Sequence, residues 1–211
     1  MNSRNINAAY LGNMDSMVAF SPGMTTQERT DIQNILLYAQ LFASQQYDFL
    51  EQWSSWMHYY RNRLEKLGLR SAGKVTQDSL LLTSIEDLEQ ATFGVMGEPD
   101  SSQLVSLVRR SFDALGVYQK AEAFFQGDFN QKRLTGFQIV PCEKTCSNEI
   151  RLLLCSLHLN TDSHSSGDGR LIFYFKGGSY VFAPAAYEAH RESVVRYLSG
   201  KALATIRSAR I

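Results

Sequence analysis

The side chains best suited to chemistry are three cysteines and one histidine in the second half of the chain. Cys142 and Cys146 are separated by three residues, and Cys155 and His158 by two. Thiolate and imidazole are ligands that zinc prefers, but this spacing departs from the paired C-x2-C knuckles of zinc ribbons. If residues 150–159 form a strand, Cys155 and His158 point to opposite faces. We therefore expect buried or turn cysteines rather than a metal site, expect no cofactor, and leave open whether Cys142 pairs with Cys146.

A polar segment at residues 161–169 offers a second set of reactive groups. Asp162, His164 and Asp168 are able to gather a cation or to act as an acid/base set, since loops on a rigid scaffold often carry function. The same composition is typical of any solvated turn. The sequence contains no G-x-S-x-G nucleophile elbow and neither of the two glycine-rich phosphate-binding patterns. No catalytic residue is predicted, and a hydrolase or toxin that uses the Cys/His cluster or the 162–168 loop is kept as an alternative.

Aromatic side chains form the third candidate set. On a predicted helix, Trp53, Trp56 and Tyr60 share one stripe with Met57 and Leu64. Such spacing is typical of a helix face that packs in a core. Aromatic side chains also suit a partner or an apolar ligand, because Trp and Tyr combine a large apolar area with a polar tip. The candidate partner-binding or ligand-binding residues are Trp53, Trp56, Tyr60, Tyr174, Tyr180 and Phe182.

Two consecutive amphipathic helices are predicted early in the chain. Thr25 and Glu28 form a capping-box pattern, in which each side chain accepts the other residue's backbone N–H. Asp48 and Glu51 offer a second such pattern, so we expect a break or kink near Gln46. Gly68 stands where the second helix should end.

The remaining elements give the fold class. Further amphipathic helices are predicted at 76–88 and 104–115, so that about four helices occupy the first half. After residue 135 the hydrophobic period becomes that of strands. Strands are predicted at 137–139, 150–159, 171–175 and 180–182, with a tight turn at Gly177–Gly178 and a closing helix from Pro184. The predicted fold is α+β, with an N-terminal bundle of about four amphipathic helices packed on a small antiparallel β-meander and a C-terminal helix.

The chain of 211 residues is long enough for one domain with a sizeable core. We expect residues 1–24 to form a loosely structured arm, because they are polar and interrupted by Gly12 and Pro22. Residues 25–211 are then a single α+β domain. Its helical part is 25–126, its β-meander is 135–183, and its closing helix is 184–211.

Composition limits the kinds of partner and the cellular compartment that we expect for this protein. The chain has 21 basic and 21 acidic residues, which gives no reason to expect nucleic acid as a partner. No apolar run approaches the ~20 residues of a transmembrane segment. Residues 1–5 lack the apolar region of a secretory signal. Three cysteines do not form a disulfide framework. We therefore expect a cytoplasmic protein by default, with leaderless secretion left open.

Several short motifs resemble a family of uncharacterised bacterial α+β proteins of about this size. The motifs are Leu36–Gln40, Tyr47–Asp48, Trp56 with Tyr60, Leu64–Gly68, Gly136–Ile139 with Cys142, Leu171–Tyr174, and Tyr187 with Arg191. The sequence departs from the family pattern at Leu69, where the family often has a second tryptophan. Some members of that family occur beside toxin or virulence loci. The resemblance implies a similar setting for this chain and supplies no catalytic residue.

The leading hypothesis is a non-enzymatic bacterial protein that acts by binding another protein or a small apolar ligand, as an accessory to a toxin or virulence system. It rests on the absence of a catalytic motif and on the abundance of aromatic residues. The second hypothesis is the hydrolase or toxin described above. The third is a self-assembling structural protein, for which the aromatic stripe of the helix would be the seam between copies.

Overall fold

The computed structural model describes residues 7–12, 14–73, 76–82, 87–88, 102–125, 135–160, 171–201 and 204–211. The described helices are α1 (Thr26–Ser44), α2 (Trp53–Lys66), α4 (Ser102–Leu115), α5 (Val117–Phe125) and α6 (Pro184–Ser199). The described strands are β1 (Asn7–Leu11), β2 (Asp15–Phe20), β3 (Leu69–Ser71), β4 (Thr76–Leu82), β5 (Thr135–Lys144), β6 (Ile150–Asn160), β7 (Leu171–Phe182) and β8 (Ile206–Arg210). None of these helices combines the length and the apolar character needed to pass through a bilayer.

The strands form one mixed sheet that joins both ends of the chain. Its order is β3-β7-β6-β5-β2-β1-β8. The eighth strand, β4, also pairs with β7, on the same side of β7 as β3. Among the described pairs only β2 and β5 run parallel. The fold is therefore α+β, but the predicted helix bundle on a small antiparallel meander is wrong.

The N-terminal segment is part of the sheet and not the loose arm that its composition suggested. β1 and β2 form an antiparallel hairpin, and β2 pairs with β5 in the middle of the sheet. Met17, Val18, Ala19 and Phe20 are almost completely buried. The backbone hydrogen bonds and the apolar area buried at this central position outweigh the weak local signal of a polar sequence.

Two other predictions fail for the same reason, which is pairing with β7. The predicted helix at 76–88 is strand β4 over its first seven residues, and the contiguous leucines at 80–82 fit a strand as well as a helix. β7 continues through Gly177 and Gly178, which pair with Cys155 and Leu154 of β6, so the predicted tight turn is absent. β6 pairs with both glycines, and β4 pairs with Gly177 from the other side, so the backbone stays extended through them.

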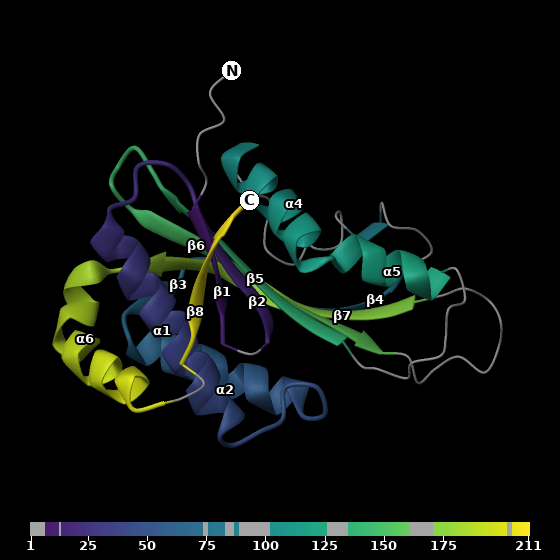
Figure 1. Cartoon of the computed structure of the whole chain (residues 1–211), viewed down its shortest axis with the longest axis horizontal. Helices are drawn as coiled ribbons and strands as arrows, with labels where there is room; N and C mark the ends of the chain where they lie inside the picture. Colours follow the sequence, from purple (N-terminus) through teal and green to yellow (C-terminus); the bar gives the residue numbers. More distant parts are fainter. Residues whose placement is uncertain are drawn as a thin grey trace.

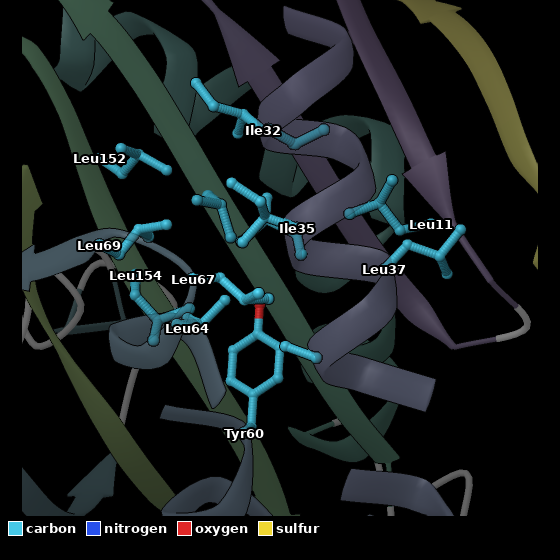
Figure 2. Packing of buried hydrophobic residues seen from close by; sticks show 14 of the residues in the cluster. Leu11, Ile32, Ile35, Leu37, Tyr60, Leu64, Leu67, Leu69, Leu152 and Leu154 are labelled. Atoms are coloured by element: carbon cyan, nitrogen blue, oxygen red, sulfur yellow. The ribbon is translucent and has the colours of Figure 1, made fainter. Parts of the chain in front are cut away.

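The helices cover the sheet in two layers, as Figure 1 shows. α1, α2 and α6 lie on one face, here called the α1/α2/α6 face, and α4 and α5 lie on the other, the α4/α5 face. Each layer buries its own apolar cluster. Figure 2 shows part of the first cluster, where side chains from α1 and α2 meet leucines from β6.

Helix ends follow the sequence signals closely. The Thr25 hydroxyl accepts the Glu28 N–H at 3.2 Å, and Glu28 Oε2 accepts the Thr25 N–H at 2.7 Å, so the predicted capping box is confirmed. Asp48 Oδ1 accepts the N–H groups of Leu50 and Glu51, although α2 itself begins five residues later. After α2, Gly68 adopts a φ of 96°, the left-handed conformation expected of a glycine C-cap.

Candidate functional site

The structure does not bring the four predicted metal-ligating residues together. Cys142 belongs to the apolar cluster of the α1/α2/α6 face, and Cys155 belongs to the cluster of the α4/α5 face. Cys146 lies in an exposed turn, and His158 contacts the rings of the α1/α2/α6 face. Within the described residues no three His, Cys, Asp or Glu side chains are placed to hold a metal ion. Burial raises the pKa of the Cys142 and Cys155 thiols, which disfavours the thiolate that metal binding or nucleophilic attack would require.

The second predicted set, Asp162, His164 and Asp168, lies outside the described residues.

The predicted aromatic residues do converge, on the α1/α2/α6 face. Trp56, Tyr60, Tyr180 and Phe182 are almost fully buried, and Trp53 is 7% exposed. The rings of Trp56 and Tyr60 stack at 4.9 Å. The helical stripe is therefore a core stripe, as its spacing predicts. A role of these residues in ligand or partner binding stays a prediction, and half-buried Tyr174, whose ring lies 6.4 Å from that of Trp53, is the member nearest to solvent.

A row of polar residues crosses the sheet beneath these aromatic rings. Four register partners on β2, β5, β6 and β7 form this row, here called the polar belt: Ser16, Gln138, Ser156 and Lys176. All four are buried. Ser16 Oγ donates to Gln138 Oε1 at 3.1 Å, and the Trp53 indole N–H donates to Ser156 Oγ at 3.0 Å. Sequence analysis missed this row. Each of the four strands has one polar residue at a position where its other residues on the α1/α2/α6 face are mostly apolar, and this could have indicated the row.

His158 lies next to the polar belt under the loop that joins α1 and α2. Its ring stacks on Trp53 at 5.7 Å and meets Phe49 edge-on at 6.4 Å. Burial lowers the pKa of His158, while a hydrogen bond to the Leu50 carbonyl and the Asp48 carboxylate act in the opposite direction. Nε2 of His158 has no hydrogen-bond partner in the described part of the chain. Ring contacts to the neutral imidazole of His158 therefore hold the loop between α1 and α2 on the sheet.

A hollow opens on the outer side of the α1–α2 pair, facing away from the sheet. Its volume is about 330 Å³, and its lining residues are Phe42, His58, Tyr59, Asn62, Arg63 and Lys66. The volume is at the lower end of the range that small ligand sites occupy. Phe42 is half-buried and forms one wall.

The lining of the hollow is cationic and aromatic. The Arg63 guanidinium lies 3.5 Å from the centroid of the Phe42 ring. Asn62 Nδ2 is 3.0 Å from His58 Nε2, and Tyr59 is one of the few large hydrophobic side chains that are exposed. The lining contains no carboxylate. Within the described residues neither Arg63 nor Lys66 forms an ion pair, so both charges are available.

Aromatic rings extend this surface on both sides of the hollow. Tyr47 packs on Tyr59 at 5.0 Å, and Tyr38 packs on Tyr197 of α6 at 4.7 Å. The Lys201 ammonium lies 5.1 Å from the centroid of the Tyr197 ring. The outer surface of α1, α2 and the end of α6 therefore carries aromatic side chains with cations stacked on them.

No protein-family model and no curated protein sequence matches the chain. Two solved structures are similar in backbone course. One is described as the structure of the Evf virulence factor, with 9% identity, a TM-score of 0.42, and coverage of 84% of this chain and 74% of that chain. The other is a delta-endotoxin, with 9% identity, a TM-score of 0.43, and coverage of 81% of each chain. Likeness at this level carries no argument about function.

Proposed function

We propose that this protein acts by binding an acidic segment of another protein in the hollow between α1 and α2. The observation that carries this proposal is the lining of the hollow. It combines two cations that form no ion pair among the described residues with exposed Tyr59 and half-buried Phe42, and it has no carboxylate. A surface of this kind complements a partner that offers carboxylates beside an apolar side chain.

The residues that line the hollow would make different contacts in such a complex. Arg63 stacks its flat face on Phe42, which leaves the N–H groups at its edge free to bind a carboxylate in a bidentate way. Lys66 supplies a second positive charge at the same site. Tyr59 offers a rigid ring against which an apolar side chain of the partner can pack, because little rotamer freedom is lost on binding.

The structure gives less support to the two alternatives. The aromatic stripe of α2 is buried against the sheet of its own chain, so it does not offer a seam between copies. The candidate nucleophiles Cys142 and Cys155 lie on opposite faces of the sheet, and burial disfavours the thiolate of each. The setting beside a toxin or virulence system rests on the sequence resemblance alone and is part of the proposal.

The test is a selection of peptides on the immobilised full chain, followed by fluorescence anisotropy with the selected peptides. We expect the selected sequences to combine Asp or Glu with an aromatic or aliphatic residue, and their affinity to fall as salt increases. Arg63→Glu should weaken binding at least about tenfold, because it removes an attractive charge and adds a repulsive one.

The matched control is Arg110→Glu, on the exposed side of α4 and on the other face of the sheet. It makes the same change in net charge, and we expect it to leave the affinity within about twofold. Equal losses in the two variants, or selected peptides without acidic residues, would refute the proposal. If the full chain instead forms dimers that Arg63→Glu disrupts, the occupant of the hollow is a second copy and the proposal is also wrong.

A further inference from the structure

Lys176 is a lysine with little access to solvent and with no partner among the described residues. It is the member of the polar belt on β7, and only 9% of its surface is exposed. Burial lowers the pKa of its ammonium group, and the charge of Arg61 lowers it further. Within the described part of the chain Lys176 forms no hydrogen bond and no ion pair through its side chain. A charged group in such a place normally has a counterion.

Arg61 approaches the same place from α2. Its Nε donates a hydrogen bond of 2.8 Å to the hydroxyl of Tyr180, which is fully buried on β7. Lys176 and Tyr180 lie on the same face of this strand, and Gly178 lies between them without a side chain. The bond to Tyr180 holds the guanidinium over β7. The terminal N–H groups of Arg61 have no partner within the described residues.

The two positive charges raise the free energy of this region unless something compensates them. Like charges that are close together and partly desolvated disfavour each other. Among the described residues, the carboxylate of Glu65 acts here and raises the pKa of the Tyr180 hydroxyl. Glu65 forms no ion pair with Lys176 or Arg61 among the described residues. The site is therefore short of negative charge.

We propose that Lys176 and Arg61 bind a small oxyanion, either a carboxylate or a phosphate group, between α2 and β7. The guanidinium offers two parallel N–H donors and the ammonium a compact charge, which is the combination that holds such groups in proteins. Tyr180 positions the guanidinium and does not need to touch the ligand. Arg61 and Tyr174, which lies two residues before Lys176 on the same face of β7, are half-buried, so the pair lies near the surface.

This site is distinct from the hollow. Arg61 lies on the side of α2 that faces β7, where it contacts Tyr180. Arg63 and Lys66 line the hollow on the outer side, where Arg63 contacts Phe42 of α1. A variant at one site is therefore a control for the other, and the two proposals can fail separately.

The experiment is side-chain NMR of lysine-labelled full chain, titrated with inorganic phosphate and, separately, with acetate at constant ionic strength. We expect the Lys176 resonance to move in a saturable way and the pKa of Lys176 to rise on binding, because the anion favours the charged amine. The resonance of Lys120, which pairs with Asp15 and lies outside both proposed sites, should not saturate. A response to phosphate alone identifies a phosphoryl ligand, and a response to both anions identifies a general oxyanion site.

A variant then tests the partner cation. Arg61→Gln should weaken the anion about tenfold, whereas Arg63→Gln should leave its affinity unchanged. The measurement on the unaltered chain does not depend on whether Arg61→Gln folds. The proposal is overturned if neither anion moves Lys176, if Lys176 moves no more than Lys120, or if a folded Arg61→Gln chain binds as tightly as the parent.

Discussion

The two faces of the sheet bury different chemistry. The α4/α5 face packs residues such as Phe137, Ile139 and Leu157 against α4 and α5, and Ser111 is the buried polar residue among the described residues of these two helices. The α1/α2/α6 face carries the polar belt and buried polar atoms without hydrogen-bond partners in the described residues, among them Nε2 of His158. No such unpartnered atom belongs to α4 or α5 in the part of the chain that the structure describes.

The difference indicates which face carries function. Buried polar groups without partners reduce stability, and among the described residues they lie on the face that carries both proposed sites. Figure 2 shows the Tyr60 hydroxyl directed among leucine and isoleucine side chains, and burial there raises its pKa, while a side-chain hydrogen bond to Gln138 of the polar belt acts in the opposite direction. Both proposed binding sites, the hollow and the Lys176 and Arg61 pair, are formed by residues of the same layer or of the strands beneath it.

The largest expected effect comes from the contact that closes the α1–α2 loop over the sheet. A Cβ added at Gly136 would lie 2.3 Å from Cε1 of Phe49, so Gly136→Ala must displace that ring. We expect a loss of about 3 kcal/mol in the free energy of unfolding, measured with urea. Gly200→Ala is the control, because its Cβ would meet nothing closer than 3.7 Å. A loss of less than about 1 kcal/mol would show that Phe49 is not fixed by Gly136.

A pair of serine variants compares the two faces directly. Ser156→Ala removes the acceptor of the buried Trp53 indole N–H, so we expect a loss of about 2 kcal/mol in the free energy of unfolding. On the other face, Ser111 donates only to the carbonyl of Leu107 in its own helix, and Ser111→Ala should change stability by less than about 0.5 kcal/mol. Equal losses would remove the distinction between the faces.

These comparisons also show what a sequence can predict. The helices α1, α4 and α6 were predicted because capping residues, apolar spacing and a first-turn proline are local signals, as at Thr25, Gly116 and Pro184. The strands β1, β4 and β8 were missed. β4 pairs with β7 and β8 pairs with β1, and both partners lie far away along the chain. β1 pairs with β2, which the sequence had not identified as a strand. Local propensity cannot report a distant partner.

The candidate sites divide in the same way. The burial of Trp53, Trp56 and Tyr60 followed from their helical spacing. The polar belt did not, because four residues from four strands become neighbours only through the sheet register. The hollow depends on how Phe42 of α1 meets Arg63 of α2, and no spacing within either helix encodes that contact.

The smallest expected effect is on the pH dependence of stability, through His158. Burial holds its pKa in the folded protein below the ordinary value, so the unfolded chain binds this proton more readily. The stability that neutral His158 contributes is present above about pH 6.5 and is lost as the pH falls through the folded pKa. We expect the free energy of unfolding to decrease with acidification in that window, and His158→Phe to flatten the decrease. Parallel pH profiles of the parent and the variant would contradict this.

The central claim, that the α1/α2/α6 face and not the α4/α5 face binds the partner, is tested most directly by backbone NMR of the full chain with a selected acidic peptide. We predict that the amide resonances of α2 around Tyr59, Asn62 and Lys66 shift, and that those of α4 and α5 do not. Shifts confined to α4 and α5, or no saturable shift on α2, would contradict the claim.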